Sequence, residues 1–184
     1  MHVLFFAGSL RADSYNKKYA REALRLATDA GAHGEFLDLR DYAMPVYDGD
    51  IEAASGIPEA TKQLSAKIKA ADALVISAPE YNGSITGVLK NTLDWLSREK
   101  PVSIAGKHLL LLGASTGALG GVRGLWQTRM PFEVLGVHAY PTVMGLPKAD
   151  AAFDEQGRLK DEKTAQQLGK LIGSFMQHVK GKAG

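Results

Sequence analysis

The sequence predicts an α/β fold in which a parallel sheet is covered by helices on both faces. Short apolar runs alternate along the chain with segments whose apolar residues recur at helical spacing. The first run, at residues 3–7, is continuous rather than alternating, which indicates a strand buried on both faces, as in parallel sheets. No repeat or linker interrupts this order. We therefore expect one domain over residues 1–184, with about 180–184 frayed.

Five apolar runs predict the strands, at residues 3–7, 35–39, 73–77, 108–113 and 140–144. Gly8 ends the first run, and Pro79, which has no N–H for a β-ladder, marks the end of the third. The fourth run contains four consecutive leucines. Pro141 lies inside the fifth run and weakens its assignment as a strand.

Helical spacing predicts five helices, at residues 14–30, 58–71, 88–98, 121–135 and 161–179. Gly31 suits the C-terminal cap of the first helix, and Pro58 suits the first position of the second. Gly124 and Pro131 predict a break or kink in the fourth. Two stretches are expected to be irregular or polar connections, residues 40–56 and 147–160.

Composition excludes several classes of protein. The chain has no cysteine, which rules out disulfide scaffolds, thiolate metal sites and thiol nucleophiles. The 22 Lys and Arg against 20 Asp and Glu give a net charge of +2 without a basic cluster, so we expect no nucleic-acid partner. The histidines show no metal-ligand spacing, so we expect no metal. No apolar run approaches the roughly 20 residues of a membrane span, and no signal-peptide pattern is present. We expect a cytoplasmic protein with no membrane partner.

The loop after the first strand is dense in groups that bind anions. Ser9 and Ser14 offer hydroxyls, Asn16 an amide, and Arg11 a guanidinium suited to phosphate. The loop leads into a helix N-terminus, whose free N–H groups and dipole favour an anion. Asp13 would oppose a phosphate unless it points outward. An ordinary capped surface turn is the alternative interpretation.

No G-x-x-x-x-G-K-[ST] or G-x-G-x-x-G motif follows the first strand, which argues against a nucleotide triphosphatase and against a Rossmann dinucleotide site.

Two further loops follow the third and fourth strands, at residues 79–84 and 115–121. Tyr81 offers an aromatic face and Gly83 allows a ligand to approach closely, whereas Ser115 and Thr116 add hydroxyls beside small residues. Either loop alone is equally well interpreted as an ordinary turn. Ligands of doubly wound sheets bind at the carboxyl ends of the strands, so the three loops together predict a phosphate cradle and two walls for a planar ring. A flavodoxin-like sheet holds a flavin mononucleotide in this way.

Three motifs carry a family resemblance. They are G-S-x-R-x-x-S-x-N at residues 8–16, P-E-Y-N-G-S at 79–84 and L-K-N-x-x-D-W at 89–95. Together they resemble the NADPH-dependent FMN reductase family, which includes quinone, chromate and azo-dye reductases. The resemblance extends over about residues 3–179. It implies a flavodoxin-like three-layer fold with a five-stranded parallel sheet in the order 2-1-3-4-5, non-covalent FMN, NADPH or NADH as co-substrate, and a homodimer or homotetramer.

Carried over residue by residue, the resemblance implies a set of cofactor-binding residues: Ser9, Leu10, Arg11, Ser14, Tyr15, Asn16, Pro79, Glu80, Tyr81, Asn82, Gly83, Ser115, Thr116 and Gly117. Some quinone and chromate reductases of the family carry an aromatic residue at the position of Gly83. The wall over the flavin is therefore expected to be more open here, which leaves the acceptor undecided.

The resemblance implies an FMN-dependent NAD(P)H oxidoreductase with ping-pong hydride transfer to a small-molecule acceptor. Quinone, flavin, azo and metal-oxyanion acceptors all stay open, as does the choice of NADPH or NADH. No catalytic acid, base or nucleophile is predicted, since the flavin carries the chemistry and no G-x-S-x-G elbow is present. The alternatives are a flavodoxin-type electron carrier without NAD(P)H turnover, which the near-neutral charge disfavours, and a flavin-free regulatory protein.

The helix predicted at residues 88–98 is apolar around most of its circumference. Its polar strip consists of Lys90, Asn91 and Asp94. Such a helix is either buried in the core or shared with a partner. The family resemblance favours an oligomer interface at this helix.

Overall fold

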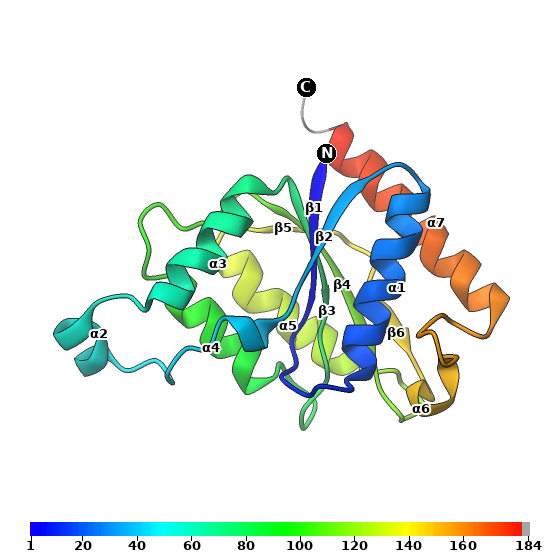
Figure 1. Cartoon of the computed structure of the whole chain (residues 1–184), viewed down its shortest axis with the longest axis horizontal. Helices are drawn as coiled ribbons and strands as arrows, with labels where there is room; N and C mark the ends of the chain where they lie inside the picture. Colours follow the sequence, from blue (N-terminus) through cyan, green and yellow to red (C-terminus); the bar gives the residue numbers. More distant parts are fainter. Residues whose placement is uncertain (182–184) are drawn as a thin grey trace.

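A parallel six-stranded sheet forms the centre of the computed structural model, which describes residues 1–181 (Figure 1). Its strands are β1 (His2–Ala7), β2 (His33–Leu37), β3 (Ala73–Ser77), β4 (His108–Ala114), β5 (His138–Ala139) and β6 (Met144–Leu146). The spatial order is β2-β1-β3-β4-β5, and β6 also pairs with β4. Every pairing is parallel. The predicted order 2-1-3-4-5 is confirmed, but the sheet has six strands rather than five.

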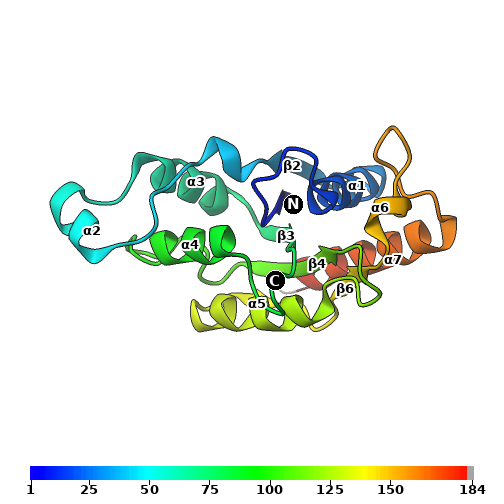
Figure 2. The ribbon, with the colours of Figure 1, turned by 90° about the horizontal axis from the view of Figure 1, so that it is seen from below.

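Within residues 1–181, seven α-helices and one 3₁₀ turn accompany these strands. They are α1 (Tyr15–Asp29), the turn η1 (Leu39–Asp41), α2 (Gly49–Ser55), α3 (Glu59–Ala70), α4 (Gly87–Leu96), α5 (Val122–Val134), α6 (Ala149–Ala152) and α7 (Glu162–Lys180). Figures 1 and 2 show three layers, with α1 and α7 on one face of the sheet and α3, α4 and α5 on the other.

Alternate residues of the strands separate the two cores. Val3 and Phe5 of β1 pack with α1 and α7, whereas Leu4 and Phe6 pack with α3, α4 and α5. Because side chains alternate across a strand, a continuous apolar run buries both faces. This arrangement confirms the interpretation of the apolar runs as central parallel strands.

The topology determines where a ligand can bind. The chain leaves β1 toward α1 on one face of the sheet and leaves β3 toward α4 on the other. The two connections diverge and open a crevice at the carboxyl ends of the neighbouring strands β1 and β3. The loops after β1, β3 and β4 meet at the lower edge of the view in Figure 1.

The fifth predicted strand, residues 140–144, is wrong as a single element. The structure splits it into β5 before Pro141 and β6 after it, each paired with β4. Proline offers no N–H to a ladder, so pairing is interrupted around this residue and resumes further along.

The second predicted strand, residues 35–39, is displaced. β2 begins at His33 and ends at Leu37, in register with His2–Phe6 of β1. Asp38 then accepts a hydrogen bond from the backbone N–H of Arg40 and starts η1. The register against β1 sets the limits of this strand more strongly than its own composition does.

Several further expectations about the connections and helix ends need correction. The stretch 40–56 is not wholly irregular, because it holds the end of η1 and all of α2, and 147–160 contains α6. The expected break in helix 121–135 is absent: α5 is continuous with Pro131 inside it. Pro58 is the N-cap of α3 rather than its first helical residue. At the C-terminus α7 extends through Lys180, and 182–184 of the stretch expected to fray lie outside the described residues.

The apolar side of α4 faces the protein's own core. Leu89, Leu93, Trp95 and Leu96 are each at most 2% exposed. The indole N–H of Trp95 donates to the Pro45 carbonyl at 2.8 Å. The chain itself thus covers the apolar residues of helix 88–98, so these residues no longer argue for an interface with a partner. No helix among residues 1–181 is long and apolar enough to cross a membrane.

Candidate functional site

The three loops predicted to hold a ligand line one cavity of about 210 Å³. Its walls are Ser9, Arg11, Ser14, Tyr15, Asn16, Pro79, Glu80, Tyr81, Ala114, Ser115 and Thr116. All but Ala114 were predicted from the sequence. Ala114 is the last residue of β4 and has no side-chain donor, so it gave no signal. The remaining predicted residues lie outside the cavity wall: Leu10, Asn82, Gly83 and Gly117.

The loop after β1 gathers groups that suit an anion. Ser14 is the N-cap of α1, and its side chain makes no capping hydrogen bond. Ser9 accepts a hydrogen bond from the Arg11 N–H at 3.3 Å. Both serines are buried, and the first turn of α1 carries no acidic residue. The positive end of the helix and two inward hydroxyls therefore face the same cavity.

Charge around this loop favours a phosphate. Arg11 is exposed, and its guanidinium donates to the Asp13 carbonyl at 3.4 Å. The Asp13 side chain is 75% exposed and pairs with Lys18 at 2.7 Å. This pairing lowers the pKa of the Asp13 carboxyl. Asp13 thus points outward and is neutralised, which removes the objection that the sequence raised.

Asn16 joins the helix to two strands. Its Oδ1 accepts from the Ser77 hydroxyl at 2.8 Å and from the Ala114 N–H at 2.9 Å. Its Nδ2 donates to the Ala114 carbonyl at 2.9 Å. The Asn16 amide therefore holds the start of α1 against the ends of β3 and β4, at the base of the cavity.

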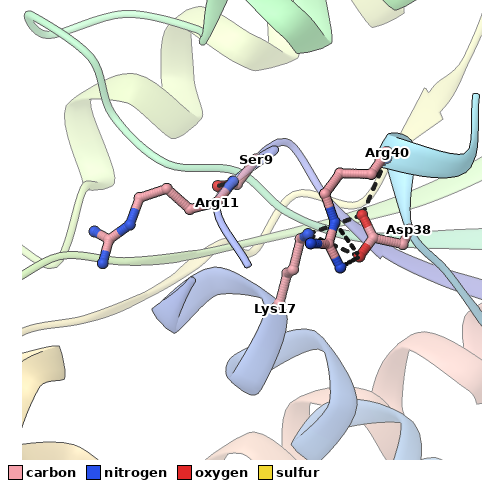
Figure 3. Close-up of polar contacts among 5 residues, drawn as sticks. All are labelled: Ser9, Arg11, Lys17, Asp38 and Arg40. Atoms are coloured by element: carbon pink, nitrogen blue, oxygen red, sulfur yellow. Dashed lines mark hydrogen bonds and ion pairs between the residues drawn. The ribbon is translucent and has the colours of Figure 1, made fainter. Parts of the chain in front are cut away.

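A charged cluster that sequence reasoning missed lies behind the loop after β1. Figure 3 shows Lys17, Asp38 and Arg40 gathered there, with Arg11 extending away from them. The buried Lys17 ammonium lies 2.8 Å from both Asp38 carboxylate oxygens, and Arg40 donates to the same carboxylate. Burial raises the pKa of Asp38, but hydrogen bonds from Lys17 and Arg40 outweigh it and the pKa is lowered. No local spacing signals a pair 21 residues apart.

The tip of the second loop is a two-residue hairpin. Tyr81 and Ser84 exchange both backbone hydrogen bonds, at 3.0 and 3.1 Å. Asn82 and Gly83 between them have φ of 52° and 77°, the left-handed pair that such a tight turn requires. Tyr81 is 53% exposed at the base of this turn. A Cβ at Gly83 would meet no heavy atom within 4 Å, so the space beside the turn is open.

The third loop is anchored by the extra strand. Ser115 donates its N–H to the Leu146 carbonyl at 3.0 Å, and its own carbonyl accepts from the Ala149 N–H at 3.1 Å. Gly120 has φ of 60°, and a Cβ there would lie 2.7 Å from backbone atoms of Gly145 and Leu146. The glycine-rich turn therefore packs closely against β6.

Arg123 and Arg129 of α5 are both paired with carboxylates of the chain itself. Arg123 pairs with Glu80 at 2.6 Å. Arg129 pairs with Glu133 at 2.6 Å and donates to the carbonyls of Ala139 and Tyr140. Within residues 1–181, no group of three or more His, Asp and Glu could hold a metal ion.

The cavity chemistry fits a flavin mononucleotide. The buried serine hydroxyls, the acid-free helix N-terminus and Arg11 suit one terminal phosphate. Tyr81 and the backbone of two strand-end loops suit a flat, hydrogen-bonding ring.

Comparison with known proteins agrees with this chemistry. Residues 1–151 match the family model for NADPH-dependent FMN reductases. An NAD(P)H-dependent FMN reductase of Pseudomonas aeruginosa is 38% identical over 97% of this chain and 95% of its own length. A quinone reductase of Escherichia coli is 34% identical over 98% and 97%.

A flavoenzyme NAD(P)H:acceptor oxidoreductase from Paracoccus denitrificans has a closely similar structure. Its TM-score is 0.85 at 29% identity, covering 98% of this chain and 97% of that one. These matches span nearly the whole chain and agree on one chemistry. This protein therefore belongs to the NADPH-dependent FMN reductase family and is an FMN-dependent NAD(P)H oxidoreductase.

Proposed function

We propose that this enzyme reduces quinones with electrons from NAD(P)H and that the cavity between the three loops is its FMN site. The observation that carries the site is the convergence of the loops after β1, β3 and β4 on one cavity at the topological switch point. The quinone acceptor is supported by relatives named quinone reductase, NAD(P)H:quinone oxidoreductase and 2-hydroxy-1,4-benzoquinone reductase, each at least 31% identical over at least 90% of this chain.

Each loop has a distinct task in this proposal. Ser9, Ser14 and Arg11 bind the phosphate, and the first turn of α1 adds its free N–H groups. Pro79, Glu80 and Tyr81 border one edge of the ring through their backbone, and Ser115 with Thr116 borders another part of it. Bound FMN supplies the hydride-accepting and electron-donating chemistry. The residues themselves bind and orient, so no side chain needs to act as acid or base.

The open space beside Gly83 suits a single binding place that two substrates occupy in turn. NAD(P)H and the acceptor then occupy the same space at different times, which predicts ping-pong kinetics. Steady-state rates with NADPH and NADH against quinone, free flavin, azo-dye and chromate acceptors test the proposal. Parallel double-reciprocal plots, with the largest kcat/KM for a quinone, are expected. Absence of NAD(P)H oxidation by FMN-loaded protein would contradict it and favour an electron carrier.

We also propose that two copies of the chain associate through α5 and the groove beside it. Trp126, Met130 and Val134 recur every four residues on α5 and are 61%, 62% and 80% exposed. Between α4 and α5 lies an apolar groove of about 370 Å³, with Met130 and Val134 on its wall. Soluble proteins seldom leave such a stripe open to water.

A second copy fits this face by charge as well. Lys90 with Asp94 on α4, and Arg129 with Glu133 on α5, place both signs along each helix. A twofold axis presents the same surface to itself, so a mixed charge pattern can pair with its own copy. We therefore place the interface on α5 rather than on helix 88–98, where the sequence placed it.

A cytoplasmic location is also part of the proposal and is supported by the absence of cysteine in the chain.

A further inference from the structure

Glu80 lies in the wall of the proposed FMN site, yet its carboxylate points toward a helix. One carboxylate oxygen accepts from the Gly124 N–H at 3.0 Å. The other accepts from the Arg123 guanidinium at 2.6 and 3.1 Å. The side chain is only 9% exposed. Glu80 therefore contacts the first turn of α5, 44 residues further along the chain.

The first turn of α5 is built to receive this carboxylate. The N-cap of α5 is Gly121, in the left-handed conformation, and it has no capping side chain. Glu80 supplies the missing acceptor and places a negative charge at the positive end of the helix. The Gly124 N–H and the Arg123 guanidinium also hold the pKa of Glu80 below its ordinary value.

Gly124 leaves the space that the contact needs. A Cβ at this position would lie 2.8 Å from the Glu80 Cβ and 2.9 Å from the Glu80 Cα. Any other residue would therefore push the loop backbone away from α5. This close approach also gives a reason for a glycine within a helix, where glycine lowers stability relative to alanine.

The same loop borders the cavity through neighbouring backbone. Pro79, Glu80 and Tyr81 all line it. The Ala78 N–H before them is paired with the Leu112 carbonyl at 2.8 Å, and Tyr81 begins the hairpin that follows. Glu80 is the residue between these two anchored points whose side chain ties the loop to another element.

We propose that Glu80 is a positioning residue. Its carboxylate caps the N-terminus of α5 and thereby holds the backbone of residues 79–81 in the place where this backbone borders the flavin ring. This inference rests on the proposed FMN site and assigns a task to a side chain that the sequence placed in direct contact with the cofactor. It also joins the ring side of the site to α5, the helix with the exposed apolar stripe.

Three variants separate positioning from direct binding. Glu80→Ala removes the acceptor, and Gly124→Ala keeps Glu80 but forces the loop away from the helix. Glu80→Gln retains an oxygen for the Gly124 N–H and is the conservative rescue. Gly169→Ala is the matched control, because it is a helical glycine of α7 whose added Cβ would meet nothing within 4 Å.

The first readout is amide hydrogen exchange of the peptide spanning residues 79–84 in flavin-free protein. Glu80→Ala and Gly124→Ala are both expected to speed exchange about tenfold, since a charged hydrogen bond contributes roughly 1.5–3 kcal/mol. Glu80→Gln is expected to recover most of the protection, and Gly169→Ala to match the native protein. The second readout is FMN affinity by fluorescence titration, expected to weaken about tenfold in the two disruptive variants.

Two outcomes would overturn the proposal. One is native exchange and native FMN affinity in both disruptive variants. The other is weakened FMN binding in Glu80→Ala with native binding in Gly124→Ala, which would mean that the carboxylate touches the cofactor. If Glu80→Ala fails to fold by circular dichroism, Gly124→Ala and Glu80→Gln still decide. Failure of the FMN site itself would be separate: added FMN would then leave exchange of residues 79–84 in the native protein unchanged.

Discussion

Asn16, which the sequence suggests as a ligand-binding residue, also stabilises the fold. Its amide satisfies the Ser77 hydroxyl and both backbone groups of Ala114 inside the protein. A buried polar group left without a partner costs about 1–3 kcal/mol. We expect Asn16→Ala to lower the free energy of unfolding of the flavin-free protein by at least that amount, measured by urea titration. Unchanged stability with weakened FMN binding would show that its role is confined to the cofactor.

Arg11 is the opposite case, since its side chain is exposed, makes a long hydrogen bond to the Asp13 carbonyl and lies over the Tyr15 ring. A charge-assisted hydrogen bond to phosphate contributes roughly 1.5–3 kcal/mol. Arg11→Ala should therefore weaken FMN about 10- to 150-fold and leave the unfolding curve of the flavin-free protein in place. Arg158→Ala, an exposed arginine outside the cavity wall, is the control. Equal FMN affinity in the two variants would contradict a phosphate role for Arg11.

At the scale of elements, the Lys17–Asp38 pair fastens α1 to the end of β2. Both side chains are largely buried, at 5% and 11% exposed. Removing one member of a buried pair leaves the other without a counter-charge, which typically costs 3–5 kcal/mol. We expect Asp38→Asn to lower the free energy of unfolding by about 3 kcal/mol. The control is Glu35→Gln, which breaks an exposed pair with Lys67 and should change stability by less than about 1 kcal/mol.

The pH dependence of this pair follows from the lowered pKa of Asp38. A carboxyl with a lowered folded pKa stabilises the protein fully above its unfolded pKa and loses that contribution as pH falls through the folded value. The Asp38 contribution is therefore present at neutral pH and lost below about pH 4. Urea titrations between pH 3 and 7 should show the native protein and Asp38→Asn converging at the acid end. A constant difference across that range would exclude this linkage.

At the scale of the whole molecule, α4 buries its apolar residues in the core, whereas α5 leaves an apolar stripe exposed. Leu93 of α4 is 2% exposed and packs in the core, whereas Met130 of α5 is 62% exposed. Leu93→Glu should abolish cooperative folding because it buries a charge without a partner. Met130→Glu should leave a folded protein that sediments as a monomer, while the native chain sediments as a dimer or larger. A native monomer at micromolar concentration with full turnover would contradict the proposed association.

Much of the fold could be predicted from the sequence because the patterns that specify its strands and turns are local. The run at residues 73–77, apolar except for Ser77, is β3 with the same limits, since a strand buried on both faces has few polar positions to blur its pattern. The loops after β1, β3 and β4 were chosen because parallel topology brings their ends to one edge. The Asn-Gly pair at residues 82–83 likewise specifies its own turn, because both residues accept positive φ.

The tertiary structure decided what depends on residues far apart in the chain. Lys17 with Asp38, Asn16 with Ala114, and Glu80 with Gly124 are contacts 21, 98 and 44 residues apart. No periodicity encodes them, because each arises only after strands and helices have packed. The same holds for the face of α4, because an apolar surface is typical both of helices buried in a core and of helices at an interface. Sequence pattern therefore determined the sheet and the loops that meet at its edge, and packing decided which side chains are left to bind a ligand.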